Sequence, residues 1–272
     1  MENTTSTRAK VTAPGLLAWK TEGRKIVMLT AYDYPSARLA DRAGVDIVFV
    51  GDSLGMTVLG YDTTIPVTME EMIFHVKAAR RGVAKALLLA DMPFGSYQAS
   101  PEDAVRNATR LMKEAGAAAV KLEGGAPVAA TVQRLTQAGM PVMGHLGLTP
   151  QSIHLMGGNR LQGAGAAEAE RIIDDARALE QAGAFAVVLE TIPAALAREV
   201  TAALTIPTVG IGAGPYCDGQ VTVWHDMLGI TPGRAFRHTR RYAELGREME
   251  EAITRYAQEV RDQTFPGPEN YV

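Results

Sequence analysis

Four acidic residues each follow a predicted β-strand: Asp52, Asp91, Glu123 and Glu190. In parallel sheets and barrels the carboxyl ends of the strands face one side, where such folds bind their ligands. Crowded carboxylates repel one another and raise each other's pKa, so such a site needs a cation or a use for a protonated acid. Taken singly, each acid has the alternative role of capping the next turn or helix. Four together favour a shared site.

A divalent metal ion is the simplest partner for these acids. Hard carboxylates, with no cysteine cluster and no paired histidines such as H-E-x-x-H, favour magnesium or manganese over zinc. Magnesium is usually held by one or two carboxylates together with water and substrate oxygens. This chemistry predicts two acids as direct ligands, one that acts through water and one that is left for acid–base work.

Lys121 and His145 add hydrogen-bond donors to the predicted site. Lys121 lies two residues before Glu123, on the same face of the fourth strand, and suits a substrate carboxylate or an enolate oxygen. Its alternative role is an ion pair with Glu123. His145 follows the fifth strand within Gly144–Gly147 and could donate to a substrate oxygen, although a structural role is equally open.

The glycine-rich segment Gly210–Gly214 suggests a nucleotide-binding loop, but the G-x-G-x-x-G pattern fails because Pro215 occupies its last position. Glycines that follow the seventh strand of a barrel can bind phosphate. The alternative is a tight turn that gives the backbone clearance at the pocket. The sequence leaves both readings open.

Apolar strands and amphipathic helices alternate along the chain, and they must position these residues. The dipeptide Ala-Gly precedes a strand four times, at 43–44, 115–116, 138–139 and 182–183. Each pair marks a helix end, because glycine takes the left-handed conformation without penalty. The predicted strands are Ile26–Thr30, Val45–Val50, Ala86–Ala90, Ala117–Leu122, Pro141–Gly144, Phe185–Leu189, Pro207–Ile211 and Val221–Trp224.

Eight strands that alternate with helices predict an α/β fold, a (β/α)8 TIM barrel, with a doubly wound sheet as the alternative. An N-terminal helix that starts after Thr12 could plug the bottom of this barrel. Two loops, Leu54–Val67 and Leu146–Gly165, are longer than a barrel requires, and such loops are usually lids or binding loops.

A helical tail follows Thr231, where four apolar residues recur at helical spacing: Met249, Ile253, Tyr256 and Val260. This face predicts packing on the barrel or on a neighbouring subunit. We expect a flexible arm over residues 1–10. A single barrel domain over residues 11–272 would include the C-terminal helices at about 234–262.

The composition disfavours several classes of protein. The 272 residues include 27 lysines and arginines against 30 acids, a net charge of −3, which disfavours nucleic-acid binding. The single cysteine, Cys217, excludes an intramolecular disulfide and a multi-cysteine zinc site. We find no apolar run long enough to span a membrane and no secretory signal in Met1–Lys10, so we expect no membrane partner and a cytoplasmic location.

Several motifs together resemble one enzyme family. They are Gly51–Met56, Ala90–Phe94, Val120–Gly125, Gly144–Ser152, Leu189–Glu190, Gly210–Gly214 and Asp218–Gln220. The chain closely resembles ketopantoate hydroxymethyltransferase from about Val11 to Pro266. The resemblance implies a Mg2+-dependent TIM barrel enzyme of pantothenate and coenzyme A biosynthesis.

The implied reaction transfers a hydroxymethyl group from the cosubstrate 5,10-methylenetetrahydrofolate to 3-methyl-2-oxobutanoate. It gives 2-dehydropantoate through a Mg2+-stabilised enolate. One alternative is a metal-dependent carbon–carbon lyase or mutase of the phosphoenolpyruvate mutase and isocitrate lyase type. A non-catalytic ligand-binding barrel is a second alternative, but it would have to have lost its base or its lysine, and this chain retains Glu190 and Lys121.

The resemblance also implies roles for the acids. Asp52 and Asp91 look like direct metal ligands, and Glu123 looks like the third acid of the metal site. Glu190 looks like the catalytic proton acceptor. An efficient base near neutral pH needs a raised pKa, which partial burial and neighbouring acids could supply.

The same comparison implies a substrate site and an assembly. The residues implied to bind substrate are Asp52, Ser53, Asp91, Lys121 and His145, with His145 near the incoming hydroxymethyl group. Members of the family form homo-oligomers, often decamers. The tail departs from the family at Arg234–His238, where a Pro-Lys-Phe element is expected and a more basic run is found. This departure concerns subunit contacts and not the chemistry.

Overall fold

The computed structural model describes residues 8–231 and 238–272, and the chain divides into two compact units, Met1–Thr222 and Val223–Val272. Residues 1–7 of the predicted arm lie outside the described residues. The same holds for Arg234–Arg237, most of the segment that departs from the family pattern.

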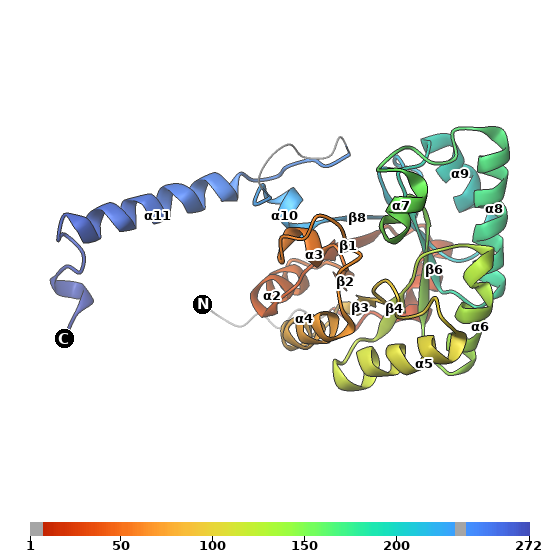
Figure 1. Ribbon diagram of the computed structural model, residues 1–272, viewed down its shortest axis with the longest axis horizontal. Coiled ribbons are helices and arrows are strands. Elements are labelled where there is room, and N and C mark those ends of the chain that lie inside the picture. The colour runs from red at the N-terminus through yellow and green to blue at the C-terminus, as the bar shows by residue number, and fades with distance from the viewer. Residues whose placement is uncertain (1–7, 232–237) are drawn as a thin grey trace. The chain divides into compact units, whose positions relative to one another are not determined.

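The first unit is a closed barrel of eight parallel strands, in which β8 pairs with β1 (Figure 1). Helices surround the ring of strands in the same view. The predicted (β/α)8 barrel is therefore confirmed. The strands are β1 (Ile26–Thr30), β2 (Ile47–Val50), β3 (Leu87–Asp91), β4 (Ala119–Lys121), β5 (Val142–Gly147), β6 (Ala186–Glu190), β7 (Thr208–Ile211) and β8 (Gly219–Thr222).

The helices of the first unit are interspersed with these strands. The longer ones are α1 (Ala13–Glu22), α2 (Tyr34–Arg42), α4 (Met69–Gly82), α5 (Pro101–Thr109), α6 (Ala129–Gln137), α8 (Ala166–Gln181) and α9 (Ala194–Ala203). Shorter turns are α3 (Leu54–Thr57), η1 (Arg110–Glu114), η2 (Ala126–Val128), η3 (Pro150–Ser152) and α7 (Ile153–Met156).

The predicted helix ends are confirmed in the backbone. Thr12 accepts a hydrogen bond from Gly15 N at the start of α1, and Ser100 accepts one from Asp103 N at the start of α5. Thr68 and Glu71 form a reciprocal capping box at the start of α4. The glycines of the four Ala-Gly pairs have φ between 82° and 94°. These local signals fix where each βα unit begins and ends.

The N-terminal helix α1 packs against the bottom of the barrel, as the sequence predicts. Leu16 is fully buried in the same apolar cluster as Ile26, Ile47 and Leu89 of the strands. Just before α1, Val11 N donates to Lys85 O, immediately upstream of β3, at 2.8 Å. Apolar side chains of α1 thus pack against the amino-terminal ends of the strands, and the four acids lie at the carboxyl ends.

β1 has its predicted bounds, the other seven strands differ from theirs, and β5 and β8 differ most. β5 extends three residues beyond the expected end at Gly144, so His145 lies within the strand and not after it. β8 begins at Gly219, two residues earlier than expected, and Trp224 already belongs to the helix α10 (Trp224–Met227). A Cβ on Gly219 would lie 2.5 Å from Ile26 O, so glycine allows β8 to approach β1 closely.

The second unit contains α10, α11 (Leu245–Arg261) and the short turn η4 (Pro268–Asn270). The helical tail is therefore present, and the ring of Tyr256 in α11 contacts that of Phe265 edge to face. What covers the apolar face of α11 stays a prediction. Among the described residues, no helix is long and apolar enough to cross a membrane.

Candidate active site

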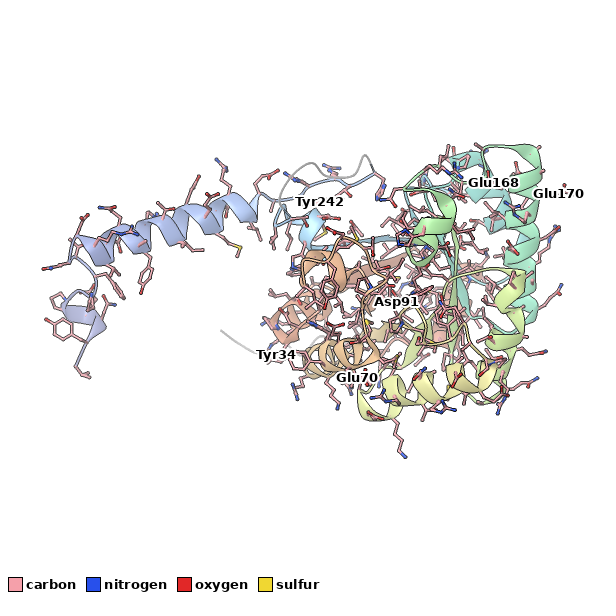
Figure 2. The ribbon with its side chains drawn as sticks, viewed as in Figure 1. Tyr34, Glu70, Asp91, Glu168, Glu170 and Tyr242 are labelled. Atoms are coloured by element: carbon pink, nitrogen blue, oxygen red, sulfur yellow. The ribbon has the colours of Figure 1, made fainter. Side chains whose placement is uncertain are left out.

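Asp52 and Asp91 lie at the ends of neighbouring strands and are joined by a hydrogen bond. Asp91, labelled in Figure 2, is the last residue of β3, and Asp52 follows β2 by two residues. The backbone N–H of Asp52 donates to Asp91 Oδ2 at 3.0 Å. Both residues are buried, with 4% and 1% of their surface exposed. The pairing of β2 with β3 therefore brings these two predicted ligands together.

Lys121 forms its ion pair with Asp91 and not with Glu123. Its Nζ lies 2.8 Å from Asp91 Oδ1, because the register of β3 and β4 places the two residues side by side. Nζ also lies 3.2 Å from His145 Nδ1. The alternative of a salt bridge between Lys121 and Glu123 is thus wrong. The lysine is buried against the acids at the mouth of the barrel.

His145 lies between the other two acids. Its Nδ1 is 3.3 Å from Glu123 Oε1, and its Nε2 is 3.1 Å from Glu190 Oε2. Glu190 is the last residue of β6, and its side chain is 17% exposed, compared with 3% for that of Glu123. The most accessible of the four acids is therefore the one predicted to act as a base.

Burial and mutual repulsion perturb the ionisation of this group. Burial raises the pKa of Asp52 well above its usual value, and the carboxylates of Asp91 and Glu123 add to the effect. Burial also raises the pKa of Asp91, although Lys121 opposes this. For Lys121 burial lowers the pKa, but the surrounding carboxylates outweigh it and the pKa rises. Lys121 therefore stays charged among the acids.

The pKa of His145 is raised to about 9, although burial and the charge of Lys121 both lower it. Hydrogen bonds with Glu123 and Glu190 outweigh these two effects because they stabilise the imidazolium form. Four carboxylates then face two cationic side chains, which leaves two negative charges uncompensated when all the acids are ionised. A divalent cation would balance them.

The donor set suits such an ion when water and substrate complete its coordination. In residues 8–231 and 238–272, no group of three or more His, Cys, Asp or Glu side chains is arranged to hold a metal jointly. The backbone of Asp52 is hydrogen-bonded to the carboxylate of Asp91, and Mg2+ sites often use one or two carboxylates plus waters and substrate oxygens. The residues present therefore fit Mg2+ with an incomplete protein shell.

Ser53 and the glycine-rich turn complete the mouth. Ser53 Oγ lies 2.8 Å from the hydroxyl of Tyr32, in the loop after β1. In the segment after β7, Gly212 and Gly214 have φ of 63° and 77°. A Cβ on Gly214 would lie 2.5 Å from the Cβ of Ala194 at the start of α9. This close approach supports the tight-turn reading of the segment.

Two buried residues of the site were given no role by the sequence: Tyr97, after β3, and Gln151, in η3. Gln151 Nε2 donates to Asp52 Oδ2 at 2.8 Å, and Gln151 N donates to Glu123 Oε2 at 3.0 Å. Gln151 lies in a motif of the family resemblance, but sequence spacing gives no sign that it reaches Asp52. The contacts described for the four acids favour a shared site over separate helix caps.

Gly147 sets the position of Glu190, because these residues are paired across β5 and β6. Gly147 has φ of 89°, and a Cβ there would lie 2.2 Å from Glu190 O. We expect Gly147→Ala to lower the free energy of unfolding by at least about 2 kcal/mol, because a left-handed alanine and a backbone clash add together. Urea denaturation measures this loss.

Gly139→Ala is the matched control for Gly147→Ala. Gly139 has φ of 82°, but a Cβ there would meet nothing within 4 Å. It should therefore show only the conformational cost of about 1 kcal/mol. Equal losses in the two variants would contradict the role given to the Gly147–Glu190 contact.

The fold and the site define the class of protein: an enzyme barrel whose chemistry lies at the carboxyl ends of its strands. Similar solved structures include phosphonopyruvate hydrolase in complex with oxalate and Mg2+, with a TM-score of 0.62, 14% identity and coverage of 96% of this chain and 93% of that one. Phosphoenolpyruvate phosphomutase from Streptomyces platensis subsp. rosaceus has a TM-score of 0.60 and 17% identity, and the match covers 93% of this chain and 88% of that one. At these identities the likeness shows the fold alone.

The family model of ketopantoate hydroxymethyltransferase matches residues 10–268. A relative from Moorella thermoacetica, named 3-methyl-2-oxobutanoate hydroxymethyltransferase, is 57% identical and covers 97% of this chain and 98% of its own. A relative of the same name from Carboxydothermus hydrogenoformans is 56% identical, with coverage of 94% and 93%. The chain belongs to the ketopantoate hydroxymethyltransferase family and is a transferase. The resemblance drawn from its motifs is confirmed, and the lyase, mutase and non-catalytic readings are set aside.

Proposed function

We propose that this chain transfers a hydroxymethyl group from 5,10-methylenetetrahydrofolate to 3-methyl-2-oxobutanoate and releases 2-dehydropantoate, with Mg2+ as its metal. The family and the names of the relatives support the reaction. The observation that carries the proposal is the buried pair Asp52–Asp91 beside Lys121, with Glu190 on the opposite side of His145. In this arrangement the residues proposed to bind the metal and the keto acid lie apart from Glu190, which is proposed to take the proton.

Asp52 and Asp91 would hold the metal directly, and Glu123 would act through a water molecule. Bound there, Mg2+ supplies positive charge beside the carboxylate and carbonyl oxygens of a 2-keto acid, where negative charge develops when C3 loses its proton. Lys121 remains protonated among the acids and would bind the substrate's carboxylate or its developing oxyanion. Ser53 would donate to the keto acid through the hydroxyl that now contacts Tyr32.

Glu190 would accept the C3 proton. Its Oε2 contacts His145 Nε2, which leaves Oε1 as the proton acceptor. The methylene carbon is bonded to two folate nitrogens. The C3 electron pair forms a bond with this carbon, both carbon–nitrogen bonds break, and water supplies the new hydroxyl. The two nitrogens take up two protons, the one removed from C3 and one from that water. His145, held by Glu123 through Nδ1, would turn the N–H of Nε2 from Glu190 to the oxygen of the incoming hydroxymethyl group.

The proposal includes a cytoplasmic location and a homo-oligomeric assembly, with a decamer as the form that the resemblance implies. The single free cysteine, Cys217, is buried and suits a reducing compartment. The apolar face of α11, formed by Met249, Ile253, Tyr256 and Val260, would serve subunit contact, and sedimentation of the full chain measures the assembly directly.

The test is direct detection of 2-dehydropantoate from the two substrates. We expect activity to be lost in excess chelator and to return with Mg2+, Mn2+ or Co2+, because hard-oxygen sites discriminate weakly among similar divalent ions. Omission of the folate should abolish product formation while metal is present. Full turnover in excess chelator would refute the metal requirement, and product formed without the folate would refute the transfer.

A further inference from the structure

Gln151 joins two of the acids at the mouth of the barrel. Its side-chain Nε2 donates to Asp52 Oδ2 at 2.8 Å, and its backbone N donates to Glu123 Oε2 at 3.0 Å. Asp52 comes from the loop after β2 and Glu123 from the loop after β4, so a single residue in the loop after β5 spans both. Gln151 is 4% exposed, which protects these hydrogen bonds from competition by water.

The orientation of the Gln151 amide follows from its other partners. Its Nε2 also lies 3.0 Å from the carbonyl oxygen of Met92, which can only accept a hydrogen bond. The atom that faces Met92 O and Asp52 must therefore be the NH2 group. The oxygen, Oε1, faces the hydroxyl of Tyr97 at 2.6 Å.

Tyr97 holds the amide in this orientation. Glu123 N donates to the Tyr97 hydroxyl at 3.1 Å, which directs the hydroxyl proton toward Gln151 Oε1. Gln98 Nε2 donates to the same Oε1 at 3.2 Å. The amide therefore cannot turn over without losing hydrogen bonds on both sides. Tyr97 and Gln151 form a buried network that ends on the carboxylates of Asp52 and Glu123.

We propose that Gln151 is a positioning residue for the metal site, held in place by Tyr97. It fixes Asp52 Oδ2 and Glu123 Oε2, which leaves Asp52 Oδ1 for the ion and turns Glu123 Oε1, the oxygen that also contacts His145, toward the water of the ion. This inference rests on the proposed function, and it adds residues to which neither the sequence nor the relatives' names give a role. Partners that orient metal ligands in this way are typically worth about 10–100-fold in metal affinity.

The experiment is calorimetric titration of the metal-depleted full chain with Mg2+ alone. We expect Gln151→Met, which keeps the length of the side chain but removes its hydrogen bonds, to weaken Mg2+ binding by about 10–100-fold. Tyr97→Phe should also weaken Mg2+ binding, but by less than Gln151→Met does, because Gln151 keeps its hydrogen bonds to Asp52 and Met92. Tyr97→Phe also carries the test should Gln151→Met fail to fold.

Gln162→Met is the matched control. Gln162 is a second buried glutamine of the same loop, and its Nε2 donates to the backbone oxygen of Arg160. It should bind Mg2+ as the wild type does. A melting experiment separates positioning from simple stabilisation: a purely structural role would lower the melting temperature but leave the Mg2+-induced shift unchanged, whereas a positioning role shrinks that shift.

Wild-type chain that takes up no Mg2+ would overturn the proposed metal site, and this inference with it. Wild-type binding together with an unchanged affinity in Gln151→Met would overturn the inference alone. Affinity reduced equally in Gln151→Met and Gln162→Met would also overturn it, because the effect would then belong to the loop as a whole. Reduced affinity in Gln151→Met and Tyr97→Phe, with Gln162→Met unchanged, is the result that supports it.

Discussion

Glu190→Gln should lower kcat by about 10²–10⁴-fold, which raises the barrier by roughly 3–5 kcal/mol. The amide keeps the size of the side chain but cannot take the C3 proton of the substrate. The affinities for Mg2+ and for 3-methyl-2-oxobutanoate should change far less, because Asp52, Asp91 and Lys121 are unaltered. Steady-state kinetics combined with binding titrations separates the two effects.

Glu170→Gln is the control for this variant. Glu170 is exposed on α8, away from the mouth (Figure 2), so its substitution should leave kcat and both affinities at the wild-type values. A loss of keto-acid affinity in Glu190→Gln as large as its loss of kcat would show that Glu190 binds substrate and is not the base.

Asp52→Asn should abolish tight Mg2+ binding and nearly all turnover. The amide is neutral and a poor ligand for a hard cation, and a metal ion contributes several kcal/mol of charge stabilisation to such reactions. A loss of activity of at least about 10³-fold is therefore expected, since each 1.36 kcal/mol is tenfold in rate. Calorimetric titration measures the loss of Mg2+ binding, and an activity assay at saturating substrate measures the loss of turnover.

Asp174→Asn provides the comparison for Asp52→Asn. The side chain of Asp174 is 66% exposed on α8, where it pairs with Arg177, and surface pairs of this kind contribute little. Unchanged Mg2+ affinity in Asp52→Asn would remove Asp52 from the set of metal ligands, whatever happened to the rate.

The barrel and the meeting of the acids could both be predicted from the sequence, because each depends on local signals. The Ala-Gly helix ends and the capping residues Thr68 and Ser100 divide the chain into βα units. Once the units are parallel, residues that follow strands must share one end of the barrel. Asp52 and Asp91 therefore come together without any knowledge of side-chain packing.

The contacts within the site depend on the register in which neighbouring strands pair, and this register could not be predicted from the sequence. The alternative role considered for Lys121 was an ion pair with Glu123, two residues away, but the pairing of β3 with β4 places Lys121 beside Asp91. His145 appeared to follow a strand that in fact extends through it to Gly147. In β8, the glycine at 219 pairs with Ile26 because it has no side chain, a reason that β-propensity does not capture.

Gln151 and Tyr97 could not be assigned a role from spacing alone. Gln151 reaches Asp52, which lies 99 residues away in the chain, through a loop whose path is set by tertiary packing. Neither residue type is itself a sign of metal chemistry. Only the structure shows that their hydrogen bonds end on the acids.

In the proposed reaction, Glu190 removes the C3 proton of a keto acid bound beside Asp52 and Asp91. Exchange of that proton for deuterium, followed by NMR of 3-methyl-2-oxobutanoate in deuterated buffer without folate, isolates this half of the reaction. We expect rapid exchange with wild-type chain and Mg2+, and exchange slowed by about 10²–10⁴-fold in Glu190→Gln. Exchange at the wild-type rate in Glu190→Gln, together with a failure to make 2-dehydropantoate, would contradict it.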